Sequence, residues 1–361
     1  MSLTVLSVAY PFASVGPDAV GGAEQVLSHL DAALVAAGHR SVVVACAGSS
    51  TAGAHVATSA AAGRITPQQR QRTCAEHRRN IERALDRYPV DLVHMHGIDF
   101  HDYLPPRGVP ALVTLHLPPS WYPASVFHLD RPDTYLHCVS RAQRRACPAG
   151  DLLLPEIENG VPVRSLQFHC RKRNFAVALG RICPEKNLHV ALDAGRIADV
   201  PVLLGGQVFP YEAHERYFRE QIAPRLDAQR RFIGPVGFAR KRRLLSAARC
   251  VLLPTLAPET SSLVAMEALA CGTPVVAFPS GAIPDVVEHG GTGFLVRTAK
   301  EMADAIAACD RIDPDHCRRV ARERFSLDSM TRKYFDVYQQ LANSPRAAAV
   351  ARYAGANFAG V

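Results

Sequence analysis

The sequence predicts an α/β fold of two Rossmann-like, doubly wound domains, each built on a parallel sheet. Apolar strand-like runs alternate with helix-like segments through most of the chain, a pattern typical of parallel sheets. The alternation occurs twice, beginning at residues 3–10 and again at residues 175–180. A chain of 361 residues also suits two domains at about 150 residues per domain.

The first copy opens with the strand LTVLSVAY and a loop that ends at Gly21-Gly22. A helix is expected over 23–37, closed by Gly38, since glycine commonly follows a helix end. Further strands are expected at 42–45, 92–94 and 112–115. We assign residues 1–165 to an N-terminal domain.

The second copy opens with the strand FAVALG at 175–180. Helices are expected from Asn187, over 211–226, over the basic run from Arg240 and after Glu259, with strands at 201–206, 231–234, 250–254 and 274–278. Residues 166–328 therefore form a C-terminal domain. The turn-rich, charged stretch 158–174 is interpreted as a hinge.

The last part of the chain is expected to contain one more helix, at about 329–343. Met330, Tyr334, Val337 and Tyr338 fall on one side of it. We expect this helix to pack back onto the N-terminal domain. The alanine-rich residues 344–361 are expected to form a flexible tail.

The most informative segment is PETSSLVAMEALACGTPVVAF at 258–278. Thr260 and Ser261 are helix-capping residue types, so Glu259 should precede a helix that carries Glu267. Helix N-termini attract anions, and the amides near Ser262, Leu263 and Val264 could hold a diphosphate between the two carboxylates. The alternative interpretation is a capped surface helix with two solvated glutamates.

Other polar residues follow predicted strands, where ligands of open α/β sheets usually bind. Arg181 and Lys186 follow residues 175–180, and His116 ends the strand LVTLH. Two such domains facing each other would leave a cleft for these groups, and the two cations suit a diphosphate. Surface placement of Arg181 and Lys186, and a core role for His116, remain as alternatives.

Composition excludes several classes of protein. Ten scattered cysteines without a CxxC pair favour buried thiols over disulfides or structural zinc. No apolar run approaches the roughly 20 residues that span a bilayer, so a cytoplasmic protein is expected. The net charge of +8 leaves peripheral contact with an anionic membrane open, through basic runs at 64–87. No motif for nucleic-acid binding occurs.

Two smaller groups of histidine and aromatic residues have more than one interpretation. His94, His96 and His101 are common zinc-ligand side chains, but no matching thiol or carboxylate set accompanies them, and no metal is expected. Trp121 and Tyr122 are either an aromatic wall for a substrate or ordinary loop packing.

Taken together, the chain resembles family 4 of the retaining glycosyltransferases, which have the GT-B fold. The resemblance rests on VGGAEQ, DLVHMHG, VTLH, ENGVPV, GRICPEKN, PETSSLVAMEALACGTPVVAF and HGGTGFLV, in this order along nearly the whole chain. The family usually has an aromatic residue and a glycine after the first glutamate, where this chain has Ser261 and Ser262.

The resemblance implies transfer of a hexose from a nucleoside diphosphate sugar to an acceptor hydroxyl, with retention and without a metal or other cofactor. By analogy Glu259 contacts the donor sugar, Glu267 the ribose, and Arg181 with Lys186 the diphosphate. Gly22, after Gly21, lets the backbone approach the diphosphate, and His116 lies beside the reacting centre.

A UDP-sugar such as UDP-glucose is the expected donor. The acceptor is expected to be a small soluble metabolite or a cell-envelope glycan or lipid. Alternative functions are a sugar-nucleotide-binding protein without catalysis, an epimerase or a phosphorylase, because one architecture serves several activities.

Overall fold

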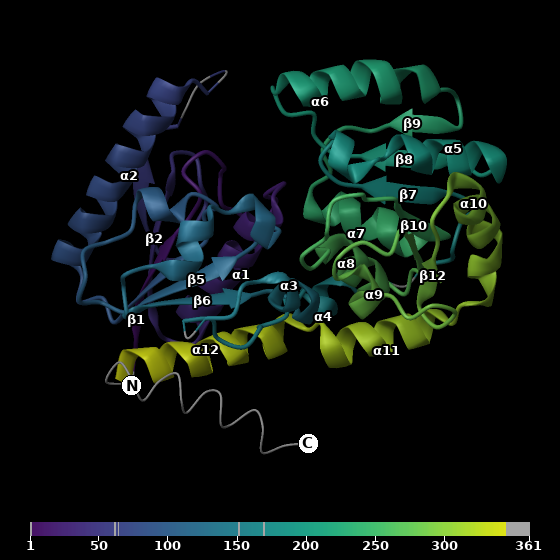
Figure 1. The fold of residues 1–361 in the computed structure, drawn as a ribbon. Helices are drawn as coiled ribbons and strands as arrows, with labels where there is room; N and C mark the ends of the chain where they lie inside the picture. Colours follow the sequence, from purple (N-terminus) through teal and green to yellow (C-terminus); the bar gives the residue numbers. More distant parts are fainter. Residues whose placement is uncertain (1, 61–62, 64, 151, 169, 344–361) are drawn as a thin grey trace. The chain divides into compact units, whose positions relative to one another are not determined.

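The computed structural model describes residues 2–60, 63, 65–150, 152–168 and 170–343. These divide into two compact units. Unit 1 contains the chain up to Glu158 and the segment that begins at Met330, and unit 2 is Asn159–Ser329. Each unit contains one six-stranded parallel sheet with helices packed on it (Figure 1). The expected α/β class is confirmed.

The sheet of unit 1 has the strand order β3-β2-β1-β4-β5-β6. Its strands are β1 (Thr4–Val8), β2 (Arg40–Cys46), β3 (Ala54–Thr58), β4 (Leu92–Met95), β5 (Ala111–Leu115) and β6 (Thr134–Cys138). β2 and β3 lie on one side of β1, and β4 to β6 lie on its other side, so the strand order changes direction between β1 and β4. In a doubly wound sheet the ligand site is expected at the carboxyl ends of the strands at this point.

The helices of unit 1 are α1 (Gly22–Ala36), α2 (Pro67–Arg87), α3 (Arg141–Ala146) and most of α12 (Leu327–Asn343), with 3₁₀ turns η1 (Phe100–Asp102), η2 (Pro119–Trp121) and η3 (Ala124–His128). The basic segment is the long helix α2, whose N-terminus has a reciprocal capping box between Thr66 and Gln69. Arg72, Arg79 and Arg83 are exposed on α2, so these side chains form a solvated basic face.

Two strands of this sheet were not expected from the sequence. β3 is an edge strand, and only Thr58 of its residues is buried. It lacks the apolar alternation that would have identified it, and pairing with β2 holds it in place. β6 is buried throughout, but its sequence TYLHC contains a histidine and a threonine in place of a continuous apolar run.

The helix α12 belongs mostly to unit 1, since the division between units falls between Ser329 and Met330. Tyr334 and Tyr338 of α12 are fully buried, and the hydroxyl of Tyr338 lies 2.7 Å from Nδ1 of His94 in β4. Residues 344–361, expected as a tail, lie outside the described residues.

Unit 2 begins earlier than the expected boundary at residue 166. Val161 pairs with Ser326 in an isolated bridge, and its amide donates to the carbonyl of Phe325 over 2.9 Å. Leu166, in the short helix α4 (Val163–Leu166), is fully buried in the core of unit 2. These contacts fix the first part of the expected hinge to unit 2.

The sheet of unit 2 has the order β12-β11-β10-β7-β8-β9. Its strands are β7 (Ala176–Leu179), β8 (Val202–Gly205), β9 (Arg230–Phe232), β10 (Cys250–Leu253), β11 (Val275–Ala277) and β12 (Gly293–Leu295). The strand order changes direction between β7 and β10. The carboxyl ends of these two strands carry Arg181 and Glu259 in the loops that follow them.

Besides α4, the α-helices of unit 2 are α5 (His189–Ile197), α6 (Glu212–Tyr217), α7 (Phe238–Ala247), α8 (Leu263–Ala270), α9 (Ile283–Val286), α10 (Ala299–Ala308) and α11 (Pro314–Arg324). The single helix expected over 211–226 is divided. It continues from α6 as a π-helical turn, η5 (Phe218–Ile222), and a 3₁₀ turn, η6 (Ala223–Arg225), and Pro224 lies in the second of these turns.

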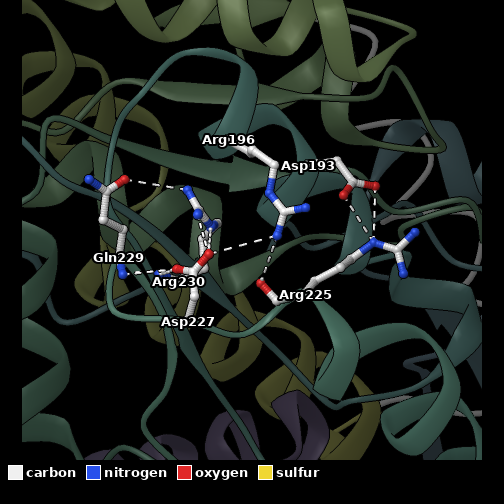
Figure 2. A network of polar contacts seen from close by, with 6 residues as sticks. All are labelled: Asp193, Arg196, Arg225, Asp227, Gln229 and Arg230. Atoms are coloured by element: carbon white, nitrogen blue, oxygen red, sulfur yellow. Dashed lines mark hydrogen bonds and ion pairs between the residues drawn. The ribbon is translucent and has the colours of Figure 1, made fainter.

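Several arginines of unit 2 hold the fold together. Figure 2 shows Asp193 of α5 accepting from Nε of Arg225 at 3.0 and 3.1 Å, and Arg230 of β9 bound to Asp227. Arg196 lies 3.7 Å from Asp227 and joins the two pairs. Part of the positive charge is therefore neutralised locally and fastens α5 to the edge of the sheet.

No helix in the described part of the chain combines the length and the apolar character that crossing a bilayer requires.

Candidate functional site

Two loops of unit 2 are tied together where β7 and β10 end. The loop after β7 contains the 3₁₀ turn η4 (Pro184–Lys186). The carbonyl of Glu185 accepts from the amide of Leu256 at 2.9 Å and from the hydroxyl of Thr255 at 3.2 Å. These bonds bring Lys186 beside the loop that carries Glu259.

Lys186 and Glu259 form an ion pair through Nζ and Oε1. Both side chains are partly accessible, at 27% and 14%, so a ligand can reach them. A third loop supports the backbone of Glu259, whose carbonyl accepts from the amide of Ala282 at 2.7 Å. Gly281 makes this approach possible: a Cβ there would lie 2.2 Å from the carbonyl oxygen of Glu259, and its φ of +58° is unfavourable for other residues.

The helix α8 begins at Leu263, and its N-cap is Ser262. The expected capping by Thr260 and Ser261 is wrong, because no side chain caps the helix and the Ser261 hydroxyl is buried without a partner among the described atoms. Ser262 has φ +48°, in the left-handed region. Glycine is the residue that adopts this conformation most easily. The first amides of α8, at Leu263 and Val264, have no acceptor within the helix.

Glu267 lies inside α8 and is buried. Its Oε1 accepts from Nζ of Lys241 in α7 over 2.5 Å. Its Oε2 is buried and has no partner among the described atoms. A buried carboxylate oxygen without a donor costs free energy, so this oxygen is suited to accept a hydrogen bond from a ligand hydroxyl.

Arg181 follows β7 directly and is partly buried. Within the described residues its guanidinium makes no hydrogen bond or ion pair. Its influence reaches the neighbouring His214, whose pKa is lowered by burial and then by the charge of Arg181. Arg181 is thus a cation available to a ligand at this edge of the sheet.

In unit 1, Gly21 and Gly22 form the start of α1. Gly21 is the N-cap, and a Cβ on it would lie 1.8 Å from Oε2 of Glu24. Gly22 is the first helical residue and is exposed. A long helix whose exposed first residue has no side chain allows a ligand anion to approach its amides.

His116 follows β5 and is 9% exposed. Its Nε2 lies 3.0 Å from Nδ1 of His96, which follows β4. The loop on both sides of His116 is fixed by Gln143 of α3, whose Nε2 donates to the carbonyls of Leu115 at 2.6 Å and Leu117 at 2.8 Å. His116 is therefore a buried, positioned histidine at the carboxyl edge of the sheet.

The aromatic pair after His116 has two different environments. Tyr122 is buried, and its hydroxyl accepts from the amide of Leu117 at 3.3 Å. Trp121 is 40% exposed. Loop packing is therefore the role that the structure gives Tyr122, and only Trp121 is accessible to a substrate.

The histidines of β4 and β6 belong to one hydrogen-bonded network with α12. Burial lowers the pKa of His137 to about 4 and that of His94 well below its usual value, so both rings are neutral at pH 7. Nδ1 of His137 donates to the Cys138 carbonyl at 3.1 Å, so its Nε2 accepts from the Thr114 hydroxyl at 2.7 Å. Nε2 of His94 must then donate to Thr114, and its Nδ1 accepts from Tyr338.

Two groups in the described part of the chain could hold a metal ion. Their ligand atoms lie within 4.8 Å of one another, and they are Cys183, Glu185 and His214 in unit 2 and Cys74, Asp99 and Asp102 in unit 1. Asp99 already binds Arg70 at 2.9 Å. The three histidines considered from the sequence form neither group.

Two functional residues were missed from the sequence. Lys241 was included in a basic run, and nothing in one sequence distinguishes it from its neighbours Arg240 and Arg242. Gln143 lies in a short helix that was not predicted.

Both halves of the chain match family models. Residues 20–154 match the model of Glycosyltransferase Family 4, and residues 173–309 match that of Glycosyl transferases group 1. The matches include Gly21, Gly22 and His116 in the first range and Arg181, Lys186, Glu259 and Glu267 in the second.

Among curated proteins, the phosphatidyl-myo-inositol mannosyltransferase of Mycobacterium leprae (strain TN) is 32% identical over 208 residues, which are 52% of this chain and 54% of that protein. The D-inositol 3-phosphate glycosyltransferase of Stackebrandtia nassauensis is 38% identical over 100 residues, 24% of this chain and 22% of that protein. The chain spans about half the length of the first of these relatives.

Solved structures share the fold over nearly the whole chain. Sucrose-phosphate synthase from Thermosynechococcus elongatus has a TM-score of 0.76 at 20% identity, covering 94% of this chain and 99% of that one. AviGT4, a glycosyltransferase involved in avilamycin A biosynthesis, has a TM-score of 0.70 at 24% identity, covering 95% and 99%. Anabaena HepE, solved with UDP-glucose, has a TM-score of 0.71 at 20% identity, covering 93% and 99%.

Proposed function

Because the chain belongs to family 4 of the glycosyltransferases, we propose that it transfers a hexose from a nucleoside diphosphate sugar to an acceptor hydroxyl. The single observation that carries the proposal is the pair of glutamates in unit 2, each bonded to a lysine. One carboxylate is accessible at the strand ends, and the other is buried with one free oxygen.

The donor would bind unit 2 at the carboxyl ends of β7 and β10. Glu267 would accept from a ribose hydroxyl through Oε2, and Glu259 would orient the hydroxyls of the sugar. Arg181, Lys186 and the amides of Leu263 and Val264 would hold the diphosphate, with the serine at 262 keeping the left-handed turn before them. In this complex the diphosphate replaces Glu259 as a partner of Lys186.

We take UDP as the nucleoside diphosphate of the donor, and glucose as the first hexose to test. HepE was solved with UDP-glucose, and this supports the choice. The mannosyltransferase name of the mycobacterial relative makes GDP-mannose the second donor to test.

The proposed reaction retains the anomeric configuration and uses no protein nucleophile. The leaving phosphate oxygen takes the proton of the acceptor hydroxyl on the same face as the glycosidic bond to the diphosphate breaks. Arg181, Lys186 and the α8 amides stabilise the charge that develops on the diphosphate. Gly21 and Gly22 are assigned to the diphosphate, and His116 to the sugar, as the resemblance to the family implies. No metal is included in this scheme.

For the acceptor we propose a small soluble polyol. The names of the relatives specify an inositol lipid in one case and an inositol phosphate in the other. A lipid acceptor is the competing choice, and in that case the exposed arginines of α2 would contact an anionic membrane surface.

The test is a thermal-shift panel of metal-free protein with UDP-, GDP- and ADP-sugars. A donor at about 100 times its dissociation constant should stabilise the protein by roughly 2.7 kcal/mol. Selective stabilisation by the sugars of one nucleotide, reduced in Glu267→Gln, supports the proposal. NMR of the product formed when an acceptor is added then gives the anomeric configuration of the transferred sugar. No stabilisation by any donor would contradict it, and binding without transfer to any polyol or lipid would favour a sugar-nucleotide-binding protein.

A further inference from the structure

Two cysteines of unit 1 lie close together without being bonded. Cys138 ends β6 and is fully buried, and Cys147 follows α3 and is partly exposed. Their sulfur atoms are 3.4 Å apart. A disulfide has an S–S bond of about 2.05 Å, so a small movement of either side chain joins them.

The accessible cysteine opens into a basic surface pocket. The pocket has a volume of about 550 Å³, and Arg141, Arg144, Arg145 and Glu156 line it together with Cys147. The two nearest ion pairs join Glu156 to Arg141 at 3.6 Å and to Arg144 at 3.7 Å. Three arginines against one glutamate leave the pocket positive, which favours an anionic ligand.

The two thiols differ in the way that exchange chemistry requires. The hydrogen bond from Cys138 and the charge of Arg144 lower the pKa of Cys147, although burial opposes them. The same hydrogen bond and burial raise the pKa of Cys138. Cys147 is therefore the thiol that reacts first, since the thiolate is the nucleophile.

We propose that Cys138 and Cys147 are a redox modification site, which a small anionic disulfide bound in the basic pocket converts to an intramolecular disulfide. Cys147 attacks one sulfur of the small disulfide, whose S–S bond breaks, and one thiolate leaves. Cys138 then attacks Sγ of Cys147 and releases the second thiolate. The two protein thiols are oxidised, the small disulfide is reduced to two thiols, and the two protein protons end on these products.

The site is connected to the loop of His116. Cys138 is the register partner of Leu115 in β5, and Gln143 lies between the two cysteines and donates to the carbonyls of Leu115 and Leu117. Closing the disulfide moves one or both ends of the segment that carries Gln143. We expect this to displace the His116 loop and lower the rate of sugar transfer, a consequence that rests on the proposed function.

The experiment uses the full chain with Cys170, which is exposed, changed to serine. The protein is incubated with glutathione disulfide over a series of ratios to glutathione, and peptides are mapped by mass spectrometry without reduction. We expect a Cys138–Cys147 cross-link. Cys138→Ser should stop at a mixed disulfide with glutathione on Cys147, and Cys147→Ser should lose no thiol.

The chain supplies a matched internal control. Cys250 and Cys309 of unit 2 are also hydrogen-bonded to each other, but both are buried, and they should stay reduced in the folded protein. The role of the pocket is tested with a neutral disulfide, bis(2-hydroxyethyl) disulfide, and a cationic one, cystamine. Arg144→Gln should slow the reaction of glutathione disulfide about two- to fivefold, the effect of one exposed ion pair. It should slow the reaction of cystamine less, because a cationic disulfide loses only the effect of Arg144 on the pKa of Cys147 and not an attraction to the pocket.

Failure to cross-link Cys138 and Cys147 at any ratio, or cross-linking of either to another cysteine, would overturn the proposal whether or not the protein transfers sugar. Equal rates for the anionic and cationic disulfides would overturn the role of the pocket. If the disulfide forms and transfer proceeds at the rate constant of the reduced protein, the connection to His116 is wrong.

Discussion

Lys241 and Glu267 form a buried ion pair that occupies one carboxylate oxygen and leaves the other without a donor among the described atoms. The pair joins α7 to α8 over 2.5 Å, and the two side chains are 13% and 4% exposed. Burying both charges is costly, and such a pair contributes little net stability. Its function is better explained by orientation, because Lys241 fixes which oxygen of Glu267 remains for a ligand.

Replacing Lys241 with methionine should weaken donor binding. The change leaves Glu267 with a buried and uncompensated charge, which should lower the stability of the protein. It also removes the contact that orients the carboxylate, so a loss of about 1–3 kcal/mol in donor affinity is expected, measured as a rise in KM for the donor or in Kd by calorimetry. The control is Lys300→Met, because Lys300 pairs with Asp304 on the surface. An unchanged donor Kd in Lys241→Met would contradict the orienting role.

The free oxygen of Glu267 should make nucleotide binding depend on the hydroxyls of the ribose. Wild-type protein should bind UDP more tightly than 2′,3′-dideoxy-UDP by about 1.5–3 kcal/mol, since a hydrogen bond to a charged group has roughly this value. Glu267→Gln should reduce this difference while keeping the shape of the side chain. Equal discrimination in both proteins, measured by competition binding, would place the ribose elsewhere.

Ser262 is in the left-handed region, and its substitutions should separate backbone conformation from side-chain chemistry. Glycine adopts φ +48° without strain, whereas a β-branched residue does so at high cost. Ser262→Gly should therefore keep stability within about 1 kcal/mol of wild type, since released strain and the added entropy of the unfolded chain oppose each other. Ser262→Val should lower both the melting temperature and the donor affinity. Equal melting temperatures for wild type, Ser262→Gly and Ser262→Val would contradict a backbone role of this position.

Tyr338 connects α12 to the sheet of unit 1 through His94. Tyr338→Phe removes one buried hydrogen bond and leaves Nδ1 of His94 without its donor, which should cost about 1–3 kcal/mol. Urea unfolding should show the loss. The matched control is Phe335→Leu, a change on the same helix at a partly buried position, where the phenyl ring contacts His39. If this variant loses as much stability as Tyr338→Phe, the loss is due to general packing and not to the hydrogen bond.

The sequence predicts those parts of the fold that have a strong local signal. Continuous apolar strands such as β10 were identified, because burial on both faces is visible in the residues themselves. β3 was missed since its residues are mostly exposed, and it is held by pairing with β2. The boundary between units was placed late because the contact of Val161 with Phe325 joins residues far apart in the sequence.

The same limit applies to the candidate site. Glu259, Glu267, Arg181 and Lys186 were chosen from one sequence by their positions after strands and around a helix. Their ion-pair partners were not predicted: no spacing rule connects Lys241 in α7 with Glu267 in a different helix. The cap of α8 was assigned wrongly, because the side-chain types of Thr260 and Ser261 do not reveal that the chain turns through a left-handed residue first.

The buried histidines of unit 1 should make its stability depend on pH. Burial lowers the pKa of His77 to about 4, of His116 to about 3 and of His137 to about 4, from 6.5 in the unfolded chain. Below pH 6.5 the unfolded state therefore binds more protons than the folded state. Stability should be full above this pH and should fall between pH 6.5 and 4, by up to about 1.4 kcal/mol per pH unit for each histidine.

Trp121, the only tryptophan of the chain, lies in unit 1 and reports its unfolding. Urea titrations followed by tryptophan fluorescence at pH 7.5, 6.5, 5.5 and 4.5 should give midpoints that decrease from the second value on. His77→Gln should reduce the dependence of the midpoint on pH, because a glutamine side chain does not titrate. The control is His128→Gln, which changes an exposed histidine in the turn η3. A midpoint independent of pH over this range would mean that the histidines are not buried in neutral form, and the hydrogen-bond directions assigned to His94, Thr114 and His137 would then be wrong as well.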